Sequence, residues 1–196
     1  RSQDPGHRIV SANVTPLSLD SPLAPEDQAR AAYYALLARL YYAGPDAALL
    51  AAIAGTDEFA SEEPSALASA WRALAAAAGA IDAAAATLEY DEVFVGTGKA
   101  EVTPYATFYL AETGREKILV RLKDEIAAMG LAKADSAREP EDHIAGLFEV
   151  MRHLILQESD DAALQQRVFF VRYIAPFFPG FCDATSASDR TNFYKH

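Results

Sequence analysis

Apolar residues recur at helical spacing along most of this chain, and that periodicity limits the possible folds more than any other feature. The first stretch places on one helical face the residues Ala29, Tyr33, Leu36, Leu37, Leu40 and Tyr41. No run alternates apolar and polar residues convincingly, as a half-buried strand would. Charged residues also interrupt each apolar segment well before the roughly 18 residues that a membrane span requires. The sequence therefore predicts a soluble, mainly helical protein.

Glycine, proline and polar residues divide this pattern into separate helices. We expect helices over residues 25–43, 46–54, 64–78, 81–95, 115–129, 140–155 and 161–174. Loops are expected over residues 56–63, 99–114 and 133–138. Pro176 and Pro179 should break the helical pattern, and residues 188–196 are typical of the first turns of one more helix.

The size of the chain favours one domain. With 196 residues, of which 51% are hydrophobic, it has enough apolar content for a real core. We assign residues 25–196 to a single all-helical domain. Residues 1–24 are polar, are punctuated by proline and lack the apolar segment of a secretory signal. We therefore expect residues 1–24 to be a disordered or vector-derived segment outside the fold.

Charge and cysteine content limit the partners. A formal net charge of −11 and the absence of any Lys/Arg cluster argue against nucleic acid. A cationic partner is easier to accommodate, although the same charge can simply keep the protein soluble. The single cysteine, Cys182, excludes an intrachain disulfide and a cysteine-based zinc or iron–sulfur site, and it fits a reducing compartment.

Candidate catalytic groups do not form a recognisable set. His7 and His196 lie in the terminal segments, whereas His143 and His153 are ten residues apart on one expected helix. That spacing is about 15 Å of helical rise, so these two side chains cannot chelate one metal ion. No HExxH, GxSxG or Cys–His pattern is present. We therefore expect no metal, no cofactor and no enzymatic activity.

The run Gly96-Thr97-Gly98-Lys99 suggests one alternative, a nucleotide-binding or GTP-hydrolysing enzyme. A phosphate-binding loop needs a glycine five positions before Gly98, where Val93 stands, and a Ser or Thr after Lys99, where Ala100 stands. The run also follows an expected helix instead of a strand. A glycine stop for that helix is the simpler interpretation.

The acidic segment Arg138–His143 precedes an apolar helical stripe and has two interpretations. In the structural one, Pro140 is the first helical residue, and Glu139, Glu141 and Asp142 complement the positive end of the helix dipole. In the functional one, the carboxylates lie beside an aromatic groove. The aromatic residues that could line such a groove, or could equally be packing residues, are Phe94, Tyr105, Phe108 and Tyr109.

Two motifs carry a resemblance to a known family. The first reads EYDEVFVGTG over residues 89–98, followed by VTPY over 102–105, and the second reads EPEDHIA over 139–145. In order and separation they resemble the two signatures of the TorD/DmsD/NarJ redox-enzyme maturation chaperones, E-Y-x-x-L-F-x-G-P-G with a following proline-aromatic loop, and E-P-D-H-I. Thr97 stands where proline is common, and Glu141 is an insertion between Pro140 and Asp142.

This resemblance covers roughly residues 25–194 and implies the all-α helical bundle of these chaperones. It also implies a cytoplasmic role: binding the twin-arginine signal peptide of a molybdopterin oxidoreductase until cofactor insertion and folding precede export. By position, the family's apolar binding surface falls on Tyr90, Val93, Phe94, Pro104 and Tyr105, and its polar rim on Glu139, Asp142 and His143. Carboxylates beside aromatic rings complement two guanidinium groups ahead of an apolar stretch.

Three points stay open at this level. The client could be any of several molybdoenzymes. The protein could be a monomer or a dimer, including one that exchanges its last helix between copies. A purely structural helical subunit is the third class of function, which would be favoured if no signal peptide bound.

Overall fold

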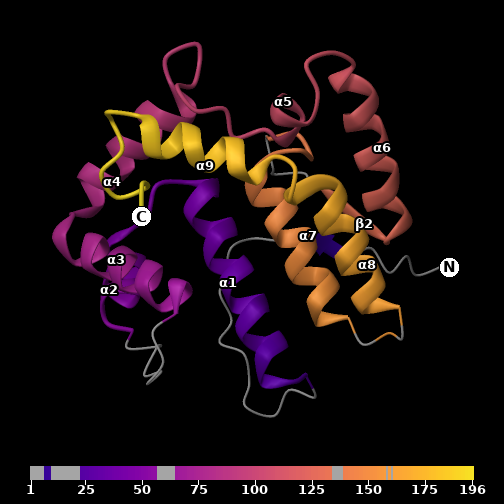
Figure 1. Ribbon diagram of the computed structural model, residues 1–196, viewed down its shortest axis with the longest axis horizontal. Coiled ribbons are helices and arrows are strands. Elements are labelled where there is room, and N and C mark those ends of the chain that lie inside the picture. The colour runs from indigo at the N-terminus through magenta and orange to yellow at the C-terminus, as the bar shows by residue number, and fades with distance from the viewer. Residues whose placement is uncertain (1–6, 10–22, 57–64, 134–138, 158, 160) are drawn as a thin grey trace, which may run out of the picture. The chain divides into compact units, whose positions relative to one another are not determined.

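The computed structural model describes residues 7–9, 23–56, 65–133, 139–157, 159 and 161–196, and within them it is mainly helical (Figure 1). Its α-helices are α1 (Pro25–Tyr42), α2 (Ala47–Ala54), α3 (Ala66–Ala80), α4 (Ala83–Tyr90), α5 (Ala106–Leu110), α6 (Arg115–Ala128), α7 (Ile144–Leu156), α8 (Ala162–Phe169) and α9 (Phe178–Ala187). Two π-helical turns, η1 (Asp91–Val95) and η2 (Phe170–Ile174), directly continue α4 and α8. The all-α fold class is thus confirmed.

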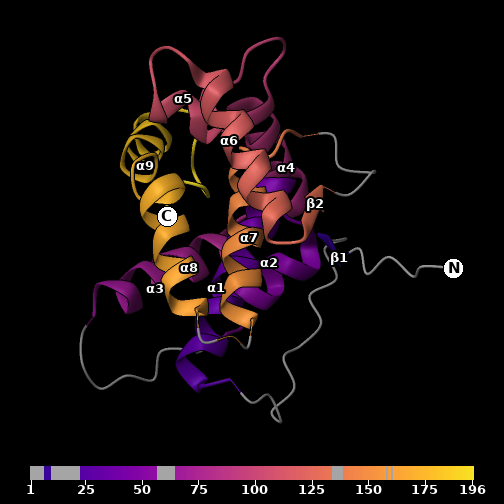
Figure 2. The same ribbon diagram turned by 90° about the vertical axis from the view of Figure 1, so that its right-hand side faces the viewer.

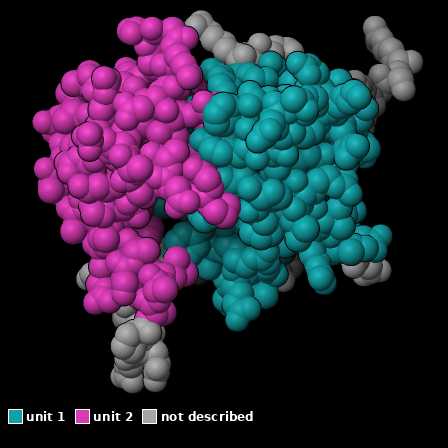
Figure 3. All heavy atoms as spheres, turned by 45° about the horizontal axis from the view of Figure 1, so that its top comes forward, with its two compact units in different colours: residues 1–41, 104–178 teal, residues 42–103, 179–196 magenta. Residues whose placement is uncertain are grey.

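The chain groups into two compact units, each made of two separate stretches (Figure 3). Unit 1 contains residues 1–41 and 104–178, and unit 2 contains residues 42–103 and 179–196. The single domain 25–196 stays a prediction. No described helix is both long enough and apolar enough to cross a membrane.

The core of unit 1 is built on α7, which lies beside α8 (Figure 2). The stripe expected from the sequence is fully buried in the structure, and it consists of Ile144, Leu147, Phe148, Met151, Leu154 and Ile155. From α1, the rings of Tyr34 and Tyr41 pack against Phe148, with centroids 5.9 and 6.3 Å apart. Helix periodicity alone therefore identified the central helix of this unit correctly.

In unit 2, α2 packs against α3, and short polar side chains begin its helices. Asp46, Ser65 and Asp82 each accept a hydrogen bond from the backbone N–H three residues later, which satisfies a donor that the helix itself leaves unpaired. The helix expected over 64–78 runs from 66 to 80 because Ser65 is its N-cap. The helices expected over 46–54 and 81–95 agree with α2 and with α4 plus η1.

A short parallel strand pair was not anticipated. β1 (His7–Ile9) pairs with β2 (Leu131–Lys133), with His7 opposite Leu131. Three-residue strands are too short to show an alternating pattern, and β1 lies in the polar, proline-punctuated segment 1–24 that we expected outside the fold. The rest of residues 1–22, most of the expected loop 56–63 and most of the expected connection 133–138 lie outside the described residues.

Three expectations about the later helices were wrong. α5 lies within the stretch 99–114 expected as a loop, because a five-residue helix has too few turns to show periodicity. α9 includes Pro179, which is tolerated because it stands in the first turn, where a backbone N–H has no helical partner. Residues 188–196 form turns instead of another helix, and their backbone N–H groups bind a carboxylate of α4.

Candidate functional site

The last two residues of the first motif, Pro104 and Tyr105, meet the second motif in unit 1 through backbone pairing. Tyr105 and His143 form an isolated antiparallel bridge. The N–H of Ala106 donates to the Asp142 carbonyl, and the N–H of Ile144 donates to the Pro104 carbonyl, both at 2.9 Å. The proline-aromatic loop and the acidic segment are therefore held side by side in extended backbone.

Side chains join the same two segments. The Tyr105 hydroxyl donates to Glu139, and its ring meets the His143 ring edge to face at a centroid distance of 5.4 Å. From α5, Thr107 donates to Asp142 at 2.5 Å. Asp142 and His143 are only 3% and 4% exposed, whereas Tyr105 and Glu139 are half-buried. The structure thus brings together four of the predicted site residues, and the fifth residue of unit 1, Pro104, is buried and paired with Ile144 through its carbonyl.

Helix α7 begins later than the sequence suggested. Pro140 is not the first helical residue, because residues 140–143 form a turn closed by a hydrogen bond from the His143 N–H to the Pro140 carbonyl. His143 is the N-cap, and its Nδ1 accepts from the Ala145 N–H at 3.3 Å. The pairing with Pro104 keeps His143 extended and so delays the helix. The acidic residues therefore precede the helix, and the prediction that Pro140 is its first residue was wrong.

Burial controls the charge of His143. Desolvation lowers the pKa of His143, and the negative charges of Glu139 and Asp142 act in the opposite direction. Because Nδ1 accepts a backbone N–H, we assign the neutral ring with its proton on Nε2. His143 therefore presents an N–H donor, not a positive charge, at neutral pH.

Each carboxylate of the acidic segment already has a partner inside unit 1. Glu139 accepts from Tyr105, Asp142 accepts from Thr107, and Glu141 lies 3.3 Å from the Lys123 ammonium group. Of Glu139 and Asp142, only Glu139 is accessible to solvent. It is therefore the carboxylate of the predicted rim that a guanidinium group could reach.

Phe108 adds an exposed aromatic surface to the same unit. Its ring is 44% exposed, and the Arg115 guanidinium stacks on it at 4.7 Å from the centroid. Phe108 follows Thr107 on α5, so it is carried on the helix that also contacts Asp142. The sequence interpretation considered Phe108 for a groove but left it out of the binding set. Its exposure depends on the α5 helix, which the sequence did not predict.

The remaining predicted residues, Tyr90, Val93 and Phe94, lie in unit 2 and are buried, with 7%, 0% and 4% exposure. Phe94 packs edge to face against Tyr194 at 5.0 Å and stacks on Phe181 of α9 at 5.9 Å. Tyr90 ends α4, and Val93 and Phe94 lie in the π-helical turn η1, which is closed by a 2.7 Å hydrogen bond from the Gly96 N–H to the Asp91 carbonyl. Such π-turns are rare and frequently occur at functional sites.

Glu89 was not singled out, although it is the first residue of the first motif. Its carboxylate is 7% exposed and accepts from the backbone N–H groups of Asn192, Phe193 and Tyr194 at 2.8 to 3.0 Å. The only feature of the sequence that pointed to Glu89 was its place directly before Tyr90 in the motif. Its hydrogen-bond partners could not be predicted from neighbouring residues, because they are more than 100 residues away.

The backbone of the Gly96–Lys99 turn explains why its first residue is glycine. Gly96 has φ 64°, and a Cβ there would lie 2.2 Å from the Lys99 carbonyl oxygen. The turn follows a π-helical segment, whereas a phosphate-binding loop follows a strand. No observation at this turn favours the nucleotide alternative. Elsewhere in the described part of the chain, no three His, Cys, Asp or Glu side chains gather as metal ligands.

Comparison of the sequence with known proteins identifies the family of this chain. The family model described as nitrate reductase delta subunit matches residues 60–183. The chain is 30% identical over 112 residues to the chaperone protein TorD of Photobacterium profundum, covering 52% of each chain. It is 25% identical over 116 residues to the chaperone protein TorD of Vibrio parahaemolyticus, covering 54% of each. It is 27% identical over 107 residues to that of Actinobacillus succinogenes, again covering 54% of each.

The chain thus spans about half the length of the curated relatives it matches. The matched region contains the whole first motif, the β-bridge and the start of α7. The family match and the motifs agree, and this chain belongs to the nitrate reductase delta subunit family, the TorD/NarJ family that its sequence resembles.

Proposed function

We propose that this protein is a cytoplasmic chaperone that binds the twin-arginine signal peptide of a molybdopterin oxidoreductase. It holds the precursor until cofactor insertion and folding precede export, and it performs no catalytic step itself. Family membership supports this proposal, as do relatives that carry the name chaperone protein TorD. The protein binds as a monomer or a dimer.

The observation that carries the proposal is the contact of Tyr105 with both Glu139 and His143 in unit 1. It places a half-buried carboxylate next to an aromatic ring, which is a surface suited to a guanidinium group followed by apolar side chains. Asp142 and His143 support this surface from below, because both are buried and bonded within the unit. The resemblance also assigns Tyr90, Val93, Phe94 and Pro104 to apolar binding, the first three of them in unit 2.

Two separable terms contribute to binding, and the apolar one should dominate. Burying the peptide's apolar stretch on aromatic side chains contributes about 25 cal/mol per Å² before ordering costs. A partly exposed ion pair at Glu139 contributes about 1 kcal/mol or less. Raising the salt concentration should therefore weaken binding only modestly.

Titration calorimetry with synthetic peptides tests the proposal. The probes are a peptide with two arginines ahead of an apolar stretch, one with Gln-Gln in place of Arg-Arg, and one with a shortened apolar stretch. Glu139→Gln preserves the size of the side chain and an acceptor for Tyr105 but removes the charge. It should weaken the arginine peptide about three- to fivefold at low salt and leave the Gln-Gln peptide unchanged.

Glu116→Gln is the matched control, because Glu116 is an exposed carboxylate on α6 of the same unit. Equal losses in the two variants would mean that only net charge matters. If the wild-type protein bound none of the peptides, a purely structural helical subunit would replace the proposed chaperone. If the shortened peptide bound as well as the full one, the aromatic residues would be packing residues only.

A further inference from the structure

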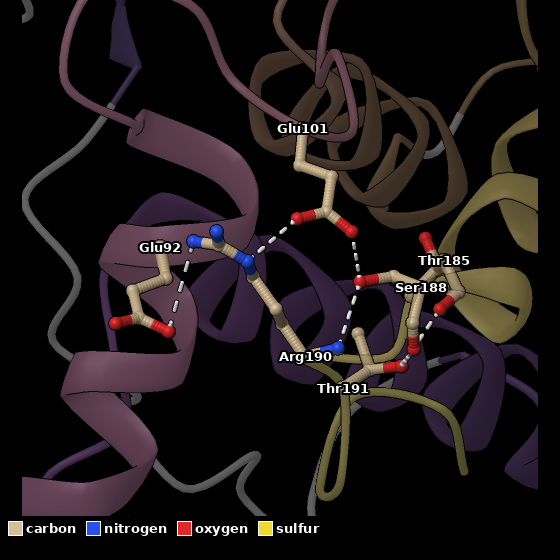
Figure 4. A network of polar contacts seen from close by, with 6 residues as sticks. All are labelled: Glu92, Glu101, Thr185, Ser188, Arg190 and Thr191. Carbon is tan, nitrogen blue, oxygen red and sulfur yellow. Dashed lines mark hydrogen bonds and ion pairs between the residues drawn. The ribbon is translucent and has the colours of Figure 1, made fainter.

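The segment of residues 188–194 in unit 2, here called the tail segment, is held by acidic side chains of the first motif region (Figure 4). Arg190 pairs with Glu101 at 3.0 Å and with Glu92 at 3.9 Å. The Ser188 hydroxyl donates to the same Glu101 carboxylate. Glu92 belongs to η1, the π-helical turn that also carries Val93 and Phe94.

The backbone of the tail segment is bound by a second carboxylate. Glu89 accepts three successive N–H groups, from Asn192, Phe193 and Tyr194, in a nearly water-free position. Hydrogen bonds to a carboxylate are stronger than those between neutral groups. Glu89 should therefore contribute most to holding the tail segment in place. Because Glu89 accepts hydrogen bonds only from backbone N–H groups, it can bind a peptide segment whatever the side chains of that segment are.

Aromatic side chains of the tail segment cover the aromatic residues of the motif. The Tyr194 ring lies 5.0 Å from Phe94 and 6.1 Å from Tyr90, measured between centroids. Phe193, next to it, is fully buried. Tyr194 therefore covers Tyr90 and Phe94 in this structure, and Phe181 of α9 also packs on Phe94.

The order of groups in the tail segment matches that of the proposed client. An arginine comes first, at position 190, and two aromatic residues follow, at 193 and 194. The arginine is received by two carboxylates, Glu92 and Glu101, and Tyr194 by two aromatic rings, Tyr90 and Phe94. We propose that the tail segment is an intramolecular ligand of a peptide site formed by Glu89, Tyr90, Glu92, Phe94 and Glu101, and that a client peptide displaces it.

This inference rests on the proposed function, because the displacing ligand is the same arginine-containing peptide. On displacement, each group of the tail segment is replaced by a similar group of the client. A client arginine replaces Arg190, and client apolar side chains replace Phe193 and Tyr194. Client backbone N–H groups replace the N–H groups of residues 192–194 that bind Glu89. The arginine end should open first. Arg190, Glu92 and Glu101 are 56%, 47% and 37% exposed, so their pairs are weak and screened by salt.

Residue-resolved amide hydrogen exchange on the full chain tests displacement directly. The probe is the synthetic peptide with two arginines ahead of an apolar stretch, and the readout is the exchange rate at Asn192, Phe193 and Tyr194. Saturating peptide should speed exchange at these three amides, because a displaced segment loses the Glu89 acceptor. Peptide that binds while these amides stay as protected as before would overturn the inference and leave the proposed function intact.

A variant supplies an independent measurement. Arg190→Ala removes the exposed ion pairs but keeps the Glu89 anchor, so the fold should be retained. Because a weakened internal ligand competes less, the arginine peptide should bind the variant up to about fivefold more tightly at low salt. The gain should shrink at high salt. Arg121→Ala on α6 is the matched control, since Arg121 is also exposed, and it should leave affinity unchanged.

The outcomes separate the two proposals. Equal or weaker binding by Arg190→Ala, with normal binding by the wild type, overturns displacement alone. No binding by the wild type, by Arg190→Ala and by Arg121→Ala overturns the proposed function, and displacement by that client with it. Tighter binding by Arg190→Ala together with faster exchange at residues 192–194 supports both.

Discussion

Tyr105 and His143 pair across an isolated antiparallel bridge, and their rings meet edge to face with centroids 5.4 Å apart. This contact joins a proline-aromatic loop to an acidic segment, with Tyr105 also bound to Glu139, which is 34 residues later in the chain. The same His143 begins α7 by accepting the Ala145 N–H. One residue therefore links the proposed peptide surface to the stability of the central helix of unit 1.

Substituting His143 should separate these two roles. His143→Ala should lower the free energy of unfolding by about 2 kcal/mol, because it removes an N-cap and a buried ring. His143→Asn should lose about 1 kcal/mol less, since Asn is a good N-cap. Urea denaturation gives both values. If His143→Asn regains stability but binds the arginine peptide as weakly as His143→Ala, the ring itself contributes to binding; equal binding by His143→Asn and wild type would contradict that role.

Stability should also depend on pH through His143. Burial lowers its folded-state pKa below the unfolded value of about 6.5, so the unfolded state binds a proton more readily between the two values. The stabilising contribution is fully present above about pH 6.5 and is lost as pH falls through the folded-state pKa. Denaturation measured from about pH 7.5 to 5 should show this slope, and His143→Asn should reduce it. An unchanged slope would assign the effect to other groups.

Asp142→Asn should affect binding more than stability. The amide oxygen can still accept from Thr107, so the buried contact keeps its geometry while the negative charge beside His143 disappears. We expect the melting temperature to change by only a few degrees and the affinity for the arginine peptide to fall several-fold. Calorimetric titration and thermal denaturation of the same sample compare the two. A proportional loss of both would mean that Asp142 has a structural role only.

Phe108→Ala should test the apolar term without disturbing the core. The ring is largely exposed and stacks on Arg115, so its removal should cost less than about 1 kcal/mol of stability. If the peptide's apolar stretch packs on it, affinity for the full-length peptide should fall about tenfold, and affinity for the shortened peptide should change less. Val120→Ala on α6, also exposed, is the control and should leave both affinities unchanged.

Gly96→Ala should destabilise unit 2 far more than Gly98→Ala. Both glycines have positive φ, which costs a residue with a Cβ roughly 1 kcal/mol. At Gly96 the new Cβ would also lie 2.2 Å from the Lys99 carbonyl oxygen, whereas at Gly98 it would meet nothing within 4 Å. We expect losses of more than about 2 kcal/mol and of about 1 kcal/mol, respectively, in urea denaturation. Similar losses would show that the turn relaxes around the added methyl group.

Much of the helical architecture followed from the sequence alone. The stripe from Ile144 to Ile155 predicted the buried face of α7, and Asp46 with Gly55 predicted both ends of α2. Gly96 predicted the end of the helix that carries the first motif. These features depend on neighbours within one or two helical turns, and such local interactions are directly visible as spacing in the sequence.

Only the tertiary structure decided which motif residues are accessible and what they contact. The pairing of Pro104 and Tyr105 with residues 142–144 moved the start of α7 to Ile144, which the helix rules applied to Pro140 could not foresee. The binding of residues 192–194 by Glu89 replaced the expected last helix with turns and covered Tyr90 and Phe94. Both effects join segments far apart in the chain, where satisfying a buried carboxylate or backbone group outweighs local helix propensity.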